Sequence, residues 1–112
     1  MSESELKKNI KIIFKSAELV YKVKDYTSAT ILYFKTLFLI LDLHILKTQG
    51  KIPKDHTERF RMLEISESDY YKFLDKNFKI YRSTYNISID KKDCEVVKKY
   101  VYELIKNEKL DI

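Results

Sequence analysis

Apolar residues recur along this chain at the spacing of an α-helix. The first apolar stripe advances by four, three, four and three residues and consists of Leu6, Ile10, Ile13, Ala17 and Val20. Positions spaced in this way share one face of a helix, because an α-helix makes one turn in about 3.6 residues. With Ser4 as its N-cap, the pattern predicts a first helix from about Glu5 to Lys24.

The second stretch differs because its apolar residues cover every side of the predicted helix. Asp25 caps this helix, which starts near Tyr26 and ends at Gly50, and Ile52-Pro53 follows as a stop. Its apolar residues are Tyr26, Ala29, Ile31, Leu32, Tyr33, Phe34, Leu37, Phe38, Leu39, Ile40, Leu41, Leu43, Ile45 and Leu46. Such a helix lies at the centre of a bundle or in an oligomer interface. Because a monomer of this size has too few other helices to enclose it, we expect a homodimer formed through this second helix.

A short third helix and a longer fourth helix follow the proline. Asp55 caps the third helix, which the pattern places from His56 to Leu63. Ser66 and Asp69 resemble an acidic capping box that opens the fourth helix. One face of the fourth helix carries Tyr70, Leu74, Phe78, Tyr81 and Tyr85, and the opposite face carries Lys72, Lys76 and Lys79.

The fifth helix begins after Asp90, with Asp93 at the capping-box position. Its apolar stripe consists of Cys94, Val97, Val101, Leu104 and Ile105. The five helices together predict an all-α fold, an antiparallel up-down helical bundle of four long helices and one short helix. The whole chain, residues 1–112, forms a single domain of this kind.

Composition narrows the classes of protein further. The chain has one Gly, one Pro and one Cys. Small β-barrels, dinucleotide-binding loops and phosphate-binding loops all need several glycines, so these classes are excluded. One Cys provides neither a disulfide framework nor a Cys-based zinc site, and the two His residues are not at metal-ligand spacing, so no metal and no cofactor are expected.

The charge balance permits contact with nucleic acid but argues against sequence-specific recognition. The net charge is +5, and only Arg59, Arg61 and Arg82 among the 22 basic residues are arginines. Lysine acts as a solvated point charge, whereas bidentate contacts to bases favour arginine.

The polar N-terminus is unlike a signal peptide, and the apolar segment Ile31–Leu46 is interrupted by charges. We therefore expect a cytoplasmic protein that does not span a membrane.

Four residues have side chains that suggest chemistry. Arg82 falls beside the aromatic face of the fourth helix, where a partly buried guanidinium would clamp a phosphate or stack on a base; the alternative is an ion pair, for example with Asp75. His56 lies at a helix start near Arg59, where a solvated side chain is the alternative to a functional one. His44 and Cys94 lie among apolar neighbours and are expected to be buried, the thiol inert.

The order of these features resembles the HEPN domain, the higher eukaryotes and prokaryotes nucleotide-binding family. The resemblance spans about Ala17 to Ile105. It comprises the segments Ala17–Tyr21 and Lys24–Ala29, then an apolar helix with Tyr33 that ends in Lys47–Pro53, then His56, and finally Tyr81–Asn86. The resemblance implies a small bundle that dimerises through its long helices and is often partnered with a nucleotidyltransferase.

Active members of that family are metal-independent ribonucleases with an Arg followed a few residues later by a His. Here Arg82 matches the Arg, but Ile87-Ser88-Ile89 occupy the following positions and no His follows anywhere. We therefore expect a dimeric binding or partner module without catalysis. Its cleft, around Arg82, Tyr85, Asn86 and His56, would contact a nucleotide, RNA or a nucleotidyltransferase partner. The alternatives are a toxin-like ribonuclease that uses Arg82 with His56, and a purely structural subunit of a nucleotidyltransferase complex.

Overall fold

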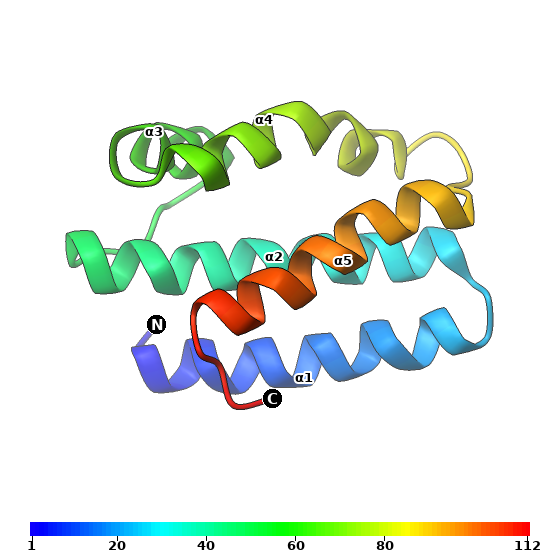
Figure 1. Cartoon of the computed structure of the whole chain (residues 1–112), viewed down its shortest axis with the longest axis horizontal. Coiled ribbons are helices and arrows are strands. Elements are labelled where there is room, and N and C mark those ends of the chain that lie inside the picture. The colour runs from blue at the N-terminus through cyan, green and yellow to red at the C-terminus, as the bar shows by residue number, and fades with distance from the viewer.

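Five α-helices and no strand make up the chain in the computed structural model, which describes all residues from 1 to 112 (Figure 1). The helices are α1 (Glu3–Lys22), α2 (Tyr26–Gln49), α3 (His56–Ser66), α4 (Ser68–Ser83) and α5 (Lys91–Asn107). The all-α prediction is therefore confirmed. The family assignment that accompanied it stays a prediction, because the helices by themselves do not identify a family.

The three aspartate caps form as predicted. The side chains of Asp25, Asp55 and Asp90 each accept a hydrogen bond from the backbone N–H three residues further on, at 3.1, 2.9 and 2.9 Å. Each bond satisfies a donor that a helix start would otherwise leave without a partner. At the other end of α2, Gly50 has a φ of 80°, a left-handed conformation that glycine adopts without strain.

Two predicted helix starts are wrong by a few residues. Ser2, not Ser4, caps α1: its side chain accepts from the backbone N–H of Glu5, whose carboxylate in turn accepts from the N–H of Ser2. Ser66 does not cap α4, because α3 continues through it and its hydroxyl donates to the carbonyl of Met62. The α4 helix starts after Glu67, which makes no side-chain cap.

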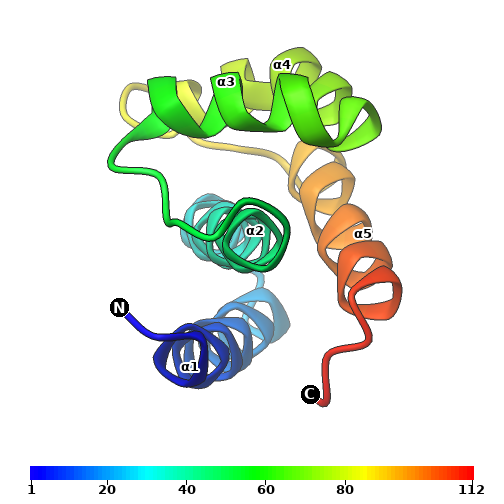
Figure 2. The ribbon, with the colours of Figure 1, turned by 90° about the vertical axis from the view of Figure 1, so that its left-hand side faces the viewer.

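Helix α2 forms the centre of the molecule, and each of the other four helices packs against it. In Figure 1, α1 runs antiparallel to α2 below it, α5 crosses obliquely in front, and α3 and α4 lie above. Figure 2 shows the same arrangement end-on, with α2 between the α3–α4 pair and α1. One chain therefore does enclose most of α2, contrary to the premise from which the homodimer was predicted, and dimerisation itself stays a prediction.

The apolar character of α2 also bears on membranes. By length and composition alone, the 24-residue helix is long and apolar enough to cross a bilayer. This corrects the expectation from Ile31–Leu46, which considered only part of the helix. In the folded chain, 67% of its most apolar window is buried against the other helices. The core helix of a soluble protein meets the same criteria, so α2 is weak evidence in either direction.

Candidate functional site

A groove runs along the strip of α2 that faces α3 and the end of α4. It has a volume of about 390 Å³ and is lined by Ile31, Lys35, Phe38, Leu39, Asp42, Arg59 and Tyr81. Ile31, Lys35, Phe38 and Asp42 follow one another at intervals of four, three and four residues, which places them on one side of α2. The groove therefore has an apolar floor with charged side chains at Lys35 and at the Asp42–Arg59 end.

A buried ion pair closes one end of the groove. Arg59 of α3 donates from Nε to Oδ1 of Asp42 at 2.7 Å and from Nη2 to Oδ2 at 3.0 Å. Only 10% of the Arg59 side chain and 9% of the Asp42 side chain are exposed. The guanidinium also lies over the ring of Phe38, 4.9 Å from its centroid. Because the pair joins α2 to α3, it fixes the position of the short helix that carries His56.

The Asp42–Arg59 pair was missed from the sequence, although a signal for it was present. Asp42 is the only acidic residue in the apolar helix, and a carboxylate that is buried there needs a cationic partner. Arg59 is one of only three arginines, and it lies one turn after the His56 that the sequence had singled out. These two facts together favour a pairing, but the sequence does not show which side of α3 faces α2.

His56 is packed inside an aromatic cluster at the start of α3. Its ring lies 4.8 Å from Phe38, 5.2 Å from Phe78 and 5.8 Å from Tyr81, measured between ring centroids. Nη1 of Arg59 is 2.7 Å from its Nδ1. A guanidinium can only donate, so Nδ1 must accept and the ring proton is carried by Nε2. Burial and the charge of Arg59 lower the pKa of His56, although Asp42 and Asp55 oppose the shift.

This environment determines what His56 can do chemically. At neutral pH the ring is uncharged, and its basic nitrogen is occupied by Arg59. A general base needs a free lone pair directed at the proton that it removes. His56 therefore offers a hydrogen-bond donor at Nε2 and no available base, which argues against the ribonuclease alternative.

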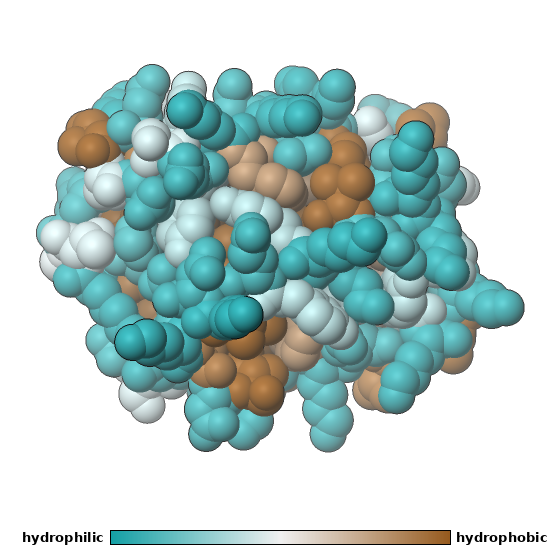
Figure 3. Space-filling model, viewed as in Figure 1, coloured by the Kyte–Doolittle hydropathy of each residue, from teal (hydrophilic) through white to brown (hydrophobic).

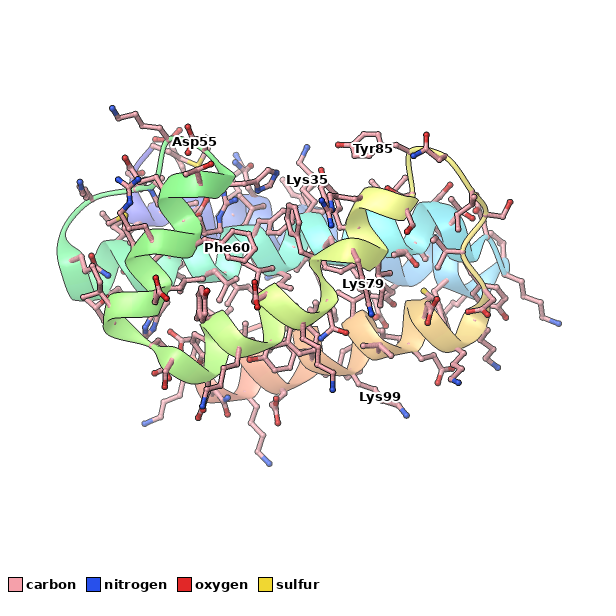
Figure 4. The ribbon with its side chains drawn as sticks, turned by 90° about the horizontal axis from the view of Figure 1, so that it is seen from above. Lys35, Asp55, Phe60, Lys79, Tyr85 and Lys99 are labelled. Atoms are coloured by element: carbon pink, nitrogen blue, oxygen red, sulfur yellow. The ribbon has the colours of Figure 1, made fainter.

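Tyr81 lines the groove, and Tyr85 extends the aromatic cluster beyond the lining residues. Their hydroxyl groups lie 3.0 Å apart, and their rings meet edge to face with centroids 5.7 Å apart. The bond to Tyr85, together with burial, raises the pKa of Tyr81 to about 12. Tyr85 itself is 72% exposed. Figure 4 shows Tyr85 and Lys35 along the same edge of the molecule, with Asp55 further along that edge.

Arg82 is exposed, which corrects the prediction of an edge-buried guanidinium. It follows the buried Asn77 by five residues, a rotation of about 140° around the helix, so it points away from the packed side of α4. No ion pair joins it to Asp75, and no hydrogen bond joins it to His56. The structure thus brings His56 next to Tyr81, which in turn contacts Tyr85, and leaves Arg82 and Asn86 exposed near the end of α4.

The other two candidate residues are packed in the interior, as expected. Cys94 is fully buried, and burial raises the pKa of its thiol. His44 is largely buried between α4 and α5, with Nδ1 3.2 Å from Oε1 of Glu108 and its ring 5.1 Å from that of Tyr70. Its Nε2 is buried without a hydrogen-bond partner.

The face of the molecule that carries α5, opposite the groove, is mixed in character. Figure 3 shows one face of the molecule, on which hydrophilic side chains surround smaller apolar patches. No group of three or more His, Cys, Asp or Glu side chains is arranged to hold a metal ion.

Comparisons with protein-family models, with curated proteins and with solved structures find no match to this chain. The resemblance to the HEPN family thus rests on the residues quoted above. What can be stated of the chain is an all-α fold with a groove whose lining includes the Asp42–Arg59 ion pair, Lys35 and Tyr81. His56 lies behind this lining, against Arg59 and Tyr81, and Tyr85 lies beside Tyr81.

Proposed function

We propose that this protein is a non-catalytic binding module whose groove takes a nucleotide or a short stretch of single-stranded RNA. The observation that carries the proposal is the exposed ring of Tyr85, whose hydroxyl is hydrogen-bonded to Tyr81, a residue that lines the groove together with Lys35. An exposed aromatic ring beside cations is the arrangement on which nucleic-acid bases stack while their phosphates are neutralised.

The charges near the groove support an anionic ligand. Lys35 is exposed and makes no ion pair, and Arg82 is likewise exposed one residue after Tyr81. The one carboxylate in the groove, Asp42, is already bound to Arg59 at both oxygens. Lys35 is therefore free to meet phosphate inside the groove, and no free carboxylate in the groove lining repels it.

The state of His56 supports binding in preference to cleavage. With Nδ1 held by Arg59, its Nε2–H can donate to a phosphate oxygen or to a base carbonyl. Such a contact orients a ligand but transfers no proton. This agrees with the sequence, in which no His follows Arg82.

The resemblance to HEPN proteins adds a dimer and a nucleotidyltransferase partner to the proposal. Helix α2 keeps one uncovered strip, and that strip includes Ile31 and Lys35 in the groove. A dimer formed through α2 would therefore use the groove or border it. Ligand and second copy would then share one surface.

The direct test is fluorescence anisotropy of a labelled oligouridine of about ten nucleotides, titrated with protein at low salt and with chelator, since electrostatic contacts are strongest at low salt. We expect Tyr85→Ala to weaken binding about tenfold or more, because one stacked base contributes about 1–3 kcal/mol. Lys35→Ala and Arg82→Ala should each weaken binding and reduce its salt dependence. The matched control is Lys15→Ala, which removes an exposed lysine from α1 and should bind as the wild type does.

Other outcomes identify the alternatives. If the oligonucleotide is cut in chelator, and the cutting is lost in both Arg82→Ala and His56→Ala, the protein is a ribonuclease and the non-catalytic proposal is wrong. If no binding occurs at low salt, neither to the oligonucleotide nor to uridine monophosphate, the groove does not serve nucleic acid and the structural-subunit alternative gains support.

A further inference from the structure

A second cavity lies at the end of the molecule where α1 begins, α2 ends and the segment after α5 returns. It has a volume of about 170 Å³ and shares no lining residue with the groove. Ile10 of α1 and the tail residues Leu110 and Ile112 form its apolar side. Figure 1 shows the tail leaving α5 and running down in front towards α1.

Lysines from three separate elements surround this cavity. Lys7 comes from α1, Lys47 from the last turn of α2, and Lys109 from the tail. Lys7 is 3.2 Å from Glu3, with both side chains 49% exposed, while Lys47 and Lys109 make no ion pair. Asp111 supplies the one carboxylate side chain in the lining, and that side chain makes no ion pair. The cavity therefore carries an excess of positive charge beside an apolar wall.

The tail that supplies four of the seven lining residues is held firmly. Glu108 accepts a hydrogen bond from the hydroxyl of Tyr70 at 2.6 Å and lies 3.2 Å from Nδ1 of His44. The backbone N–H of Leu110 donates to the carbonyl of Ile105 at 3.0 Å, and its side chain packs against the core. Lys109 is thus fixed between two anchored neighbours.

The backbone of Lys109 supports a role for its side chain. Its φ is 53°, in the left-handed region that costs a residue with a Cβ atom some strain and that glycine commonly fills after a helix. The helix dipole favours cations near the ends of α2 and α5 and so accounts in part for Lys47 and Lys109. It does not account for Lys7, which lies in the first half of α1.

We propose that this cavity binds a small organic anion with an apolar body, of the carboxylate class. The head group would lie between Lys47 and Lys109, and the body would pack against Ile10, Leu110 and Ile112. A dry cavity of about 150 Å³ holds a benzene molecule, so an aliphatic body of about five carbons fits the volume available here. Hexanoate is therefore a suitable probe.

The test is methyl NMR of the intact protein at low salt, with hexanoate, 1-hexanol and inorganic phosphate as three separate titrants. We expect hexanoate to shift the methyl signals of Ile10, Leu110 and Ile112 with a dissociation constant of about 1 mM or below, a modest affinity for a ligand of this size. Hexanol should bind at least about tenfold more weakly, because it cannot pair with the lysines. If phosphate alone moves these signals, or if hexanol binds as well as hexanoate, the proposal is wrong.

Two variants test the lysines without threatening the fold. Lys47→Ala removes an exposed cation, and Lys109→Gly removes another while placing the residue best suited to the left-handed backbone. We expect each to weaken hexanoate binding about tenfold, with Lys109→Gly unfolding at or above the wild-type temperature. Lys92→Ala, an exposed lysine at the start of α5, is the control and should leave binding unchanged. Unchanged binding in both cavity variants would overturn the proposal, as would the absence of any methyl shift with the wild type.

Discussion

Arg59 binds Asp42 through two nearly parallel hydrogen bonds, 2.7 and 3.0 Å long, and both side chains are about nine-tenths buried. This pair connects the short helix α3 to the central helix α2. Through its remaining nitrogen, Arg59 also reaches His56, 2.7 Å away. The position of α3 and the protonation of its histidine therefore depend on the same guanidinium.

Removing one partner of this pair should destabilise the fold strongly. Asp42→Ala leaves the buried guanidinium without a counter-charge, which typically costs about 3–5 kcal/mol. Replacing both residues, as in Asp42→Leu with Arg59→Met, should recover most of that loss, because no buried charge is then left unpaired. Urea denaturation of the single and double variants measures both effects. A loss below about 1 kcal/mol in Asp42→Ala would show that water reaches the pair freely.

His56 should make stability depend on pH in the mildly acidic range. Its pKa lies below the ordinary value of 6.5 because burial and Arg59 disfavour the charged ring. The unfolded chain therefore takes up this proton first, so the contribution is fully present above pH 6.5 and is lost as the pH falls towards the lower, folded-state pKa. The difference in unfolding free energy between wild type and His56→Phe should shrink over that window. NMR of the imidazole nitrogens should show the proton on Nε2, and a ring protonated at Nδ1 at pH 7 would contradict the contact with Arg59.

The junction of Tyr70, Glu108 and His44 should respond unequally to two substitutions. Tyr70→Phe removes a 2.6 Å hydrogen bond to Glu108 and should cost about 1 kcal/mol. His44→Phe removes the contact with Glu108 but also removes the buried Nε2, which has no partner. The two effects offset each other, so we expect a change close to zero. Thermal unfolding of the two variants provides the comparison, and equal losses would show that Nε2 has a partner in solution.

Self-association can be tested on the uncovered strip of α2. The other helices bury most of this helix, and Ile31, 38% exposed, lies on the part that remains. If the predicted dimer forms through α2, sedimentation equilibrium should give twice the chain mass of 13.5 kDa, and Ile31→Glu should reduce it to the monomer value. A monomer at micromolar concentration for the wild type would show that the dimer prediction is wrong.

Cys94 should be unreactive in the folded protein. The residue is fully buried, and burial raises the pKa of the thiol, so little thiolate exists at neutral pH. Labelling by a thiol reagent at pH 8 should therefore proceed at the rate of unfolding and become rapid in denaturant. Fast labelling under native conditions would mean that α5 opens locally.

Local signals in the sequence were enough to predict the helices and three of their caps. An aspartate before an apolar run satisfies a free backbone donor wherever the helix is later packed, so Asp25, Asp55 and Asp90 could be recognised in advance. The start of α1 was predicted two residues too late, at Ser4, although Ser2 and Glu5 have the spacing of a capping box. The boundary between α3 and α4 could not be predicted from the sequence, because no glycine, proline or capping side chain marks it.

The site was harder to predict because it depends on how the helices face one another. The aromatic face of α4 was predicted, and Tyr81 and Tyr85 do lie together. Whether Arg82 is buried depends on which flank of α4 the short helix α3 covers, and that is a matter of tertiary packing. The pairing of Asp42 with Arg59 depends on the same packing, across 17 positions of sequence.

The central position of α2 determines where the amino-acid sequence of this protein can vary. Its outer neighbours each keep a face in water, where substitutions are tolerated in a periodic pattern. Helix α2 meets another helix on nearly every side, and of its residues between Ala29 and Ile45 only Ile31 and Lys35 are exposed. Genetic variation that the fold survives should therefore accumulate on α1, α4 and α5. In the middle of α2, substitutions should be tolerated only on one narrow strip, and that strip lines the groove.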